Sequence, residues 1–101
     1  MINFKEETLE VLKQYGKTID DIKWIGNSTG ERTTDIQWFF NSIDFSYNDG
    51  FGCEFINQSL VIVGNNWWLE RGEYDGSEWW DFKTIPKLSK GAVKGEPKEL
   101  Y

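Results

Sequence analysis

The strongest constraint on the fold is a run of three strand-like segments between residues 59 and 85. Residues 60–63 are aliphatic, and the turn signal Gly64-Asn65-Asn66 follows them. Residues 67–74 and 77–85 are rich in aromatic side chains, and Asp75-Gly76 between them is typical of a two-residue hairpin. The pattern predicts an antiparallel meander of three strands, which Pro86 ends.

The two-residue turn decides which side chains share a face of this meander. Positions that face each other across the turn sum to 151, so Leu69 faces Phe82, and Arg71 faces Trp80. A three-residue turn would shift the last strand by one residue and exchange the faces of its tryptophans, but only the shorter turn keeps Phe82 beside Leu69. One face then forms a predicted core of Leu60, Ile62, Trp67, Leu69, Trp80 and Phe82. The other face collects Val61, Val63, Trp68, Glu70, Tyr74, Trp79 and Asp81.

Two helices and a short strand are predicted before this meander. Asn3 has capping-box spacing with Glu6, and Gly16 supplies a left-handed stop for a first helix with an apolar stripe. A second helix is expected from residue 34 or 35 to about residue 43. In the strand, residues 22–26, one face is expected to hold Ile22, Trp24 and Gly26, and the other Lys23 and Ile25.

The predicted fold class is α+β, with an antiparallel sheet of three or four strands and two helices. The 101 residues suit one domain, because a second would lack the residues to bury a core of its own. That single domain is placed at residues 1–86. Residues 87–101 are rich in Lys, Gly and Pro, which predicts a flexible basic tail.

Charge is distributed unevenly along the chain, whose formal net charge is −6. Residues 35–82 hold nine acidic residues against a single basic one, Arg71, whereas residues 83–101 hold five lysines against two glutamates. An acidic body disfavours affinity for a phosphate backbone. Direct binding of nucleic acid is therefore not expected.

Residues that usually form catalytic and metal sites are scarce. The chain has no histidine and one cysteine, Cys53, which excludes an internal disulfide and a zinc site built on several Cys or His ligands. No nucleophile stands with a base and an orienting group. An oxygen-rich loop does exist, but its spacing is not that of an EF-hand and suits a turn better; it contains Asp44, Asn48, Asp49 and Glu54. We expect no enzyme activity, no cofactor and no metal.

The expected compartment follows from what the sequence lacks. Residues 1–7 show no basic stretch followed by an apolar core, so no secretory signal is expected. The longest apolar run, residues 60–63, is too short to span a membrane, and a lone thiol suits a reducing compartment. A cytoplasmic protein without a membrane partner is the prediction.

The second face of the meander is the candidate binding surface. Tryptophan and tyrosine are enriched at protein-binding hot spots, and carboxylates surround them here. The candidate interface residues are Trp68, Glu70, Tyr74, Asp75, Glu78, Trp79 and Asp81. A simpler alternative is that the second helix covers these tryptophans while the carboxylates lie in water. Arg71 is expected to stack on Trp80 and to pair with Glu73 or Glu78.

Residues 60–71 and 73–83 resemble a family of small, uncharacterised proteins encoded by phages and prophages of Gram-positive bacteria. The shared signature is an aromatic-Leu-Glu-Arg strand, a Tyr-Asp-Gly-Ser-Glu-Trp-Trp turn and a lysine near a proline. Residues 16–18 and 24–26 match more loosely. Members of the family often carry histidine where this chain has Gly72, so the resemblance implies no shared catalytic histidine. It implies a phage accessory protein that binds and blocks, or redirects, a bacterial protein.

The leading functional hypothesis is therefore a non-enzymatic, acidic phage accessory protein that inhibits or redirects a host protein. Carboxylates spaced along strands can compete for a site meant for phosphates, so the partner could be a nucleic-acid enzyme of host defence. Two alternatives remain. One is a small-ligand module with an aromatic slot formed by Trp68, Trp79 and Tyr74. The other is a structural or assembly protein that closes its aromatic face by forming a homodimer.

Overall fold

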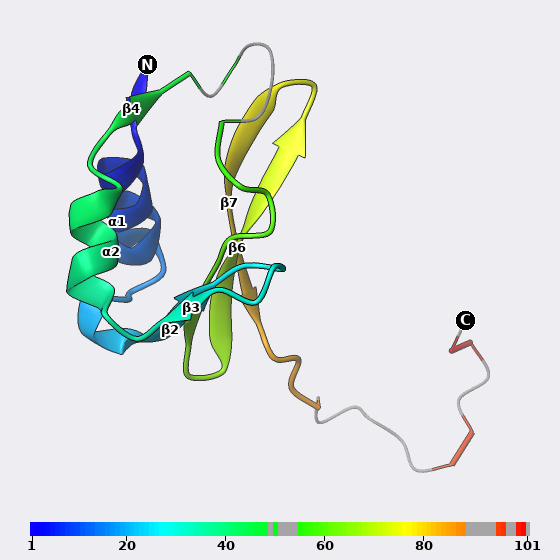
Figure 1. The fold of residues 1–101 in the computed structure, drawn as a ribbon. Helices are drawn as coiled ribbons and strands as arrows, with labels where there is room; N and C mark the ends of the chain where they lie inside the picture. The colour runs from blue at the N-terminus through cyan, green and yellow to red at the C-terminus, as the bar shows by residue number, and fades with distance from the viewer. Residues whose placement is uncertain (49, 51–54, 89–94, 97–98, 101) are drawn as a thin grey trace.

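The computed structural model describes residues 1–48, 50, 55–88, 95–96 and 99–100. Two helices, α1 (Phe4–Gln14) and α2 (Ile36–Ser42), lie on one side of a five-stranded antiparallel sheet (Figure 1). The strand order is β3 (Arg32–Thr33), β2 (Ile22–Gly26), β5 (Val61–Gly64), β6 (Trp67–Tyr74) and β7 (Ser77–Thr84). A two-stranded sheet joins β1 (Ile2–Asn3) to β4 (Ser46–Tyr47), and the 3-10 turn η1 (Ile19–Asp21) leads into β2. The predicted α+β class is confirmed, with five strands in the main sheet rather than three or four.

Each helix begins at a capping side chain: Asn3, as predicted, and Asp35, one of the two residues at which the second helix was expected to begin. The Asn3 side chain accepts a hydrogen bond from the Glu6 backbone N–H at 2.9 Å, and Asp35 accepts one from the Trp38 N–H at 3.0 Å. These bonds satisfy backbone donors that have no partner inside the first helical turn. After α1, Gly16 adopts a φ of +70°, the left-handed conformation that favours glycine.

The register of the meander is the one that the two-residue turn predicts. Leu69 pairs with Phe82 across β6 and β7, and Asp75 and Gly76 between the strands both have positive φ, as a type I′ turn requires. The first turn is centred on Asn65-Asn66, which places Ile62 opposite Leu69. Each strand of the meander therefore sends alternate residues to the helices.

Strand β2 departs from the predicted alternation. A register shift between Ile22 and Trp24 inserts an extra residue, Lys23, opposite β5. As a result Ile22 and Ile25 are both buried, while Trp24 lies on the other face of the sheet beside Val63. The expectation that Ile22 and Trp24 share a face is wrong, because a bulge reverses the alternation after it.

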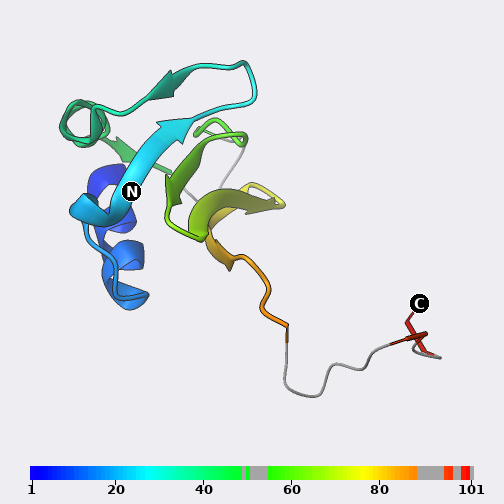
Figure 2. The same ribbon diagram turned by 90° about the horizontal axis from the view of Figure 1, so that it is seen from below.

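Both helices bury their apolar sides in the same core. Helix α2 contributes Phe39, Phe40 and Ile43 to the buried cluster that contains Phe4 of α1 and Leu69 of β6. Figure 2, a view from below, shows both helices on one side of the strands. The alternative in which the second helix covers the tryptophans of the opposite face is therefore wrong. Helix α2 packs on the core instead, because its adjacent phenylalanines, Phe39 and Phe40, are buried there.

All helices and strands of the described residues lie between Ile2 and Thr84. Most of the predicted basic tail, residues 87–101, falls outside the described part of the chain.

Candidate functional site

Arg71 is the centre of a buried charge cluster on the helix-bearing face, made of Glu7, Tyr47, Arg71 and Glu78. Its guanidinium lies 4.7 Å from the ring centroid of Trp80 and 5.2 Å from that of Phe4. Nη2 donates to Glu78 Oε1 at 3.3 Å and to the Tyr47 hydroxyl at 3.1 Å, and the Arg71 side chain is fully buried. The expected stacking on Trp80 is confirmed. Of the two expected acidic partners, Glu78 is the one that forms the ion pair with Arg71.

Glu78 is a correction to the candidate interface, because only 3% of its surface is exposed. Its register partner is Glu73, which places it on the same face as Arg71 rather than among the outward-facing carboxylates. Its carboxylate accepts hydrogen bonds from the backbone N–H groups of Phe55, at 2.7 Å, and Ile56, at 3.2 Å. A buried carboxylate needs such compensation, and with Arg71 it has enough to stay inside the fold. No partner can reach it there.

Tyr47 and Glu7 complete the cluster. The Tyr47 hydroxyl donates to Glu7 Oε1 at 2.7 Å, and the same oxygen lies 3.7 Å from Arg71 Nη1. Burial raises the pKa of Tyr47 far above its usual value, and the hydrogen bond to the Glu7 carboxylate adds to this, because both disfavour a phenolate. The four side chains come from α1, β4, β6 and β7, so the cluster ties the small sheet and α1 to the meander.

The opposite face of the main sheet, here called the outer face, carries no helix of the described residues. Three tryptophans stand on it: Trp24 and Trp68 are half-buried, and Trp79 is 38% exposed. Tyr74, near the hairpin, is 77% exposed, and Asp75 in the turn is exposed too. Besides these, the outer-face residues of the strands include Val61, Val63, Glu70, Gly72, Asp81 and Lys83.

Glycines let two of these tryptophans lie flat on the strands. The indole of Trp79 crosses Gly72, where any Cβ would collide with the ring, and its N–H donates to Asp81 Oδ1 at 2.9 Å. The indole of Trp24 leans over Gly26 in the same way and stacks with the Arg32 guanidinium, 5.2 Å from the ring centroid. These contacts hold the rings against the sheet while both tryptophans stay partly exposed.

Glu70 and Asp81 face each other directly across β6 and β7. Like charges in that position repel, and within the described residues neither carboxylate forms an ion pair. The outer face therefore combines aromatic rings with two adjacent carboxylates that form no ion pair within the described residues.

The register does not bring Trp68, Trp79 and Tyr74 together into one slot. Trp68 pairs with Lys83, whereas Trp79 pairs with Gly72, four positions further along β6. At about 3.3 Å per residue, that offset is about 13 Å. The aromatic contacts recorded among the described residues do not join these three rings to one another. An extended contact surface fits this arrangement better than a site for one small molecule.

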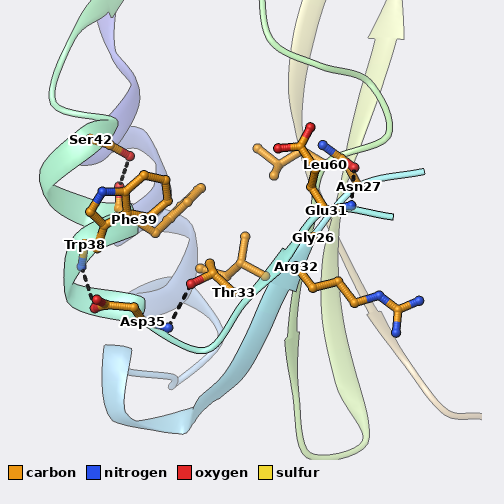
Figure 3. A pocket seen from close by; sticks show the side chains of 11 residues that line it. Gly26, Asn27, Glu31, Arg32, Thr33, Asp35, Trp38, Phe39, Ser42 and Leu60 are labelled. Carbon is orange, nitrogen blue, oxygen red and sulfur yellow. Dashed lines mark hydrogen bonds between the residues drawn. The ribbon is translucent and has the colours of Figure 1, made fainter. Parts of the chain in front are cut away.

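A separate pocket of about 490 Å³ lies on the helix-bearing side, between α2 and the β2–β3 end of the sheet (Figure 3). Trp38 and Phe39 line it from α2, and Leu60, Gly26 and Thr33 line it from the sheet side. Neither the pocket nor its exposed tryptophan, Trp38, was anticipated from the sequence, because the pocket forms only when α2 docks beside β2.

Other residues were missed for similar reasons. Trp24 joins the outer face only through the bulge in β2, and Glu7 and Tyr47 join the buried cluster through long-range packing that has no local signal. Among the proposed loop ligands, Asp49 and Glu54 lie outside the described residues, as does Cys53. Within the described residues, no group of three or more potential metal ligands is found.

Comparisons with known proteins return no match: no family model, no curated protein and no solved structure is significantly similar to the chain. Among the described residues, no helix has the length and apolar character needed to cross a membrane.

Proposed function

We propose that this protein is a non-enzymatic binding protein that contacts a protein partner through its outer face. The observation that carries the proposal is the juxtaposition of Trp24, Trp68 and Trp79 with the Glu70–Asp81 pair, on a sheet face that no helix of the described residues covers. Tryptophan and tyrosine rings that are held in place but still reach solvent supply most of the binding energy in many protein interfaces. The proposed contact residues are Trp68, Glu70, Tyr74, Asp75, Trp79 and Asp81, with Trp24 added and Glu78 removed.

A basic protein surface is the expected partner. The Glu70–Asp81 pair would be neutralised by lysine or arginine side chains, and flanking indole rings favour the same cations. The resemblance to phage and prophage proteins makes a cytoplasmic bacterial host protein the proposed partner. A nucleic-acid enzyme of host defence has the required basic surface, because it must bind phosphates.

Two features support a binding role over an enzymatic one. Arg71 and Glu78, the charged groups with the most extensive contacts, are buried. They form an ion pair with each other, and Glu78 also accepts two backbone hydrogen bonds. On the outer face the carboxylates stand on a sheet rather than in an enclosed site, and there is no histidine in the chain to act as a base.

The test is affinity capture from a lysate of Gram-positive bacteria at about 50 mM and about 500 mM salt. Wild-type protein is compared with a Tyr74→Ser, Trp79→Ser double variant and with Trp38→Ser, which removes an exposed tryptophan from α2. We expect a specific partner that the wild type and Trp38→Ser retain, that the outer-face variant loses, and that high salt weakens.

Two results would contradict the proposal. One is capture of no specific protein at low salt, and the other is equal capture by the wild type and the outer-face variant. Sedimentation of the protein alone separates the competing case of self-association: a dimer that Trp79→Ser dissociates would assign the outer face to a second copy.

A further inference from the structure

The pocket beside α2 is an open depression with the volume of a small-molecule site. Its volume of about 490 Å³ is within the range of known ligand sites, about 300–1,000 Å³. Its inner wall is apolar, since Phe39 and Ile25 are buried side chains of the core and Leu60 is half-buried.

An unpartnered tryptophan stands beside this wall. Trp38 is 59% exposed, and its indole makes no ring stacking, cation contact or hydrogen bond with any described residue. Its backbone N–H is the atom bonded to Asp35, which fixes the start of α2 and so the backbone position from which the side chain projects. The ring is available to a ligand in the pocket.

The charge that lines the pocket is negative. Glu31 and Asp35 belong to the lining, and within the described residues neither forms an ion pair. The one basic lining residue, Arg32, directs its guanidinium away from the pocket and onto the Trp24 ring of the outer face (Figure 3). Only Oδ1 of Asp35 is engaged in capping α2, which leaves its second oxygen without a recorded partner.

We propose that this pocket binds a small organic cation with an apolar body. Phe39, Leu60 and Ile25 bury the apolar part, the Trp38 ring stacks against the cationic group, and Glu31 and Asp35 neutralise it. A carboxylate of the same shape is disfavoured, because it would approach two carboxylates that form no ion pair within the described residues. The site is separate from the outer face, so it does not depend on the protein-binding function proposed above.

The test uses hexyltrimethylammonium and, as its matched anion, heptanoate, each titrated into the full-length ¹⁵N-labelled protein. The readout is the indole N–H signal of each tryptophan in ¹H–¹⁵N spectra, with Trp38 assigned by its loss in Trp38→Phe. We expect hexyltrimethylammonium to shift the Trp38 signal saturably while the signals of Trp68 and Trp79 stay in place. Heptanoate should leave Trp38 unchanged.

Two substitutions test the carboxylates without removing the helix cap. Glu31→Gln combined with Asp35→Asn keeps the capping oxygen, because asparagine caps helices as well as aspartate does. This double variant should bind the cation up to about tenfold more weakly, as the loss of two exposed charge contacts implies. Glu10→Gln, on the exposed side of α1, is the control and should bind like the wild type.

Three results would overturn the proposal. They are the lack of a saturable shift at Trp38 with the wild-type protein, equal binding of heptanoate, and unchanged affinity in the double variant. The first two use the wild-type protein, so they hold even if the double variant does not fold.

Discussion

The two faces of the β6–β7 hairpin carry the same kinds of residue, but these residues make different contacts on each face. On the helix-bearing face, Trp80 stacks on Arg71, and Arg71 pairs with Glu78. On the outer face, Trp79 bonds to Asp81, and Glu70 stands opposite with no ion pair in the described residues. Burial explains the difference, because a charge inside the fold must be compensated, whereas a charge beside water need not be.

The structural role and the proposed binding role are divided between the two faces. The helix-bearing face uses its aromatic and charged residues to join α1 and the small sheet to the meander. The outer face leaves similar residues partly exposed and without an ion pair among the described residues, at the cost of like-charge repulsion between Glu70 and Asp81. Substitutions confined to one face at a time test this division.

The largest effect is expected from Arg71→Ala. This substitution leaves the buried carboxylate of Glu78 without its cation and should lower the free energy of unfolding by about 3–5 kcal/mol. The measurement is urea denaturation followed by far-ultraviolet circular dichroism. Lys83→Ala, on the exposed outer side of β7, is the reference and should change stability by less than about 0.5 kcal/mol. A loss of stability below about 1 kcal/mol for Arg71→Ala would mean that the buried cluster does not hold α1 and the small sheet to the meander.

Glycines beneath tryptophans allow a matched test on the two faces. A Cβ at Gly64 would collide with the buried Trp67 ring, and a Cβ at Gly72 would collide with the Trp79 ring. Gly64→Ala should cost about 1–3 kcal/mol, because Trp67 is enclosed and cannot move without disturbing the core. Gly72→Ala should cost less, because Trp79 can swing into solvent. Urea midpoints of the two variants decide this, and the reverse order would show that the outer-face ring is the more rigid one.

High pH should weaken the helix-bearing face through Tyr47. The folded state holds the Tyr47 proton more tightly than the unfolded chain, in which tyrosine ionises near pH 10. Its contribution to stability is therefore complete below about pH 10 and declines above it, by up to about 1.4 kcal/mol per pH unit. Tyr47→Phe has no such proton, so its unfolding free energy should fall less between pH 9.5 and 11. Identical slopes for the variant and the wild type would contradict the role of the buried hydroxyl.

The register of the meander could be predicted because its signal is local. Asp75-Gly76 fits one common turn, and a two-residue turn fixes every pair along β6 and β7. The helix caps at Asn3 and Asp35 were predictable for the same reason, since each bond spans three residues. Local chemistry therefore accounted for the fold class and for most residues of the outer face.

The rest depends on contacts that are distant in sequence. Glu78 looked like a surface carboxylate, because the two backbone donors that hold it belong to residues 55 and 56, which carry no recognisable signal. The bulge that moves Trp24 to the outer face depends on how β2 meets β5. The pocket at Trp38 depends on how α2 docks. Such features follow from tertiary packing and not from the periodicity of any one segment.

The smallest effect in this series is expected from Glu70→Lys on the outer face. Lysine opposite Asp81 replaces a repulsive cross-strand pair with an attractive one, which should stabilise the protein by about 0.2–1 kcal/mol. The gain should be visible in urea midpoints at low ionic strength and should shrink as salt is added, because the pair is only half-buried. The same substitution should weaken capture of a basic partner, so stability and binding would move in opposite directions. A variant that loses stability, or that gains stability and still binds fully, would show that the carboxylate pair is not kept for recognition.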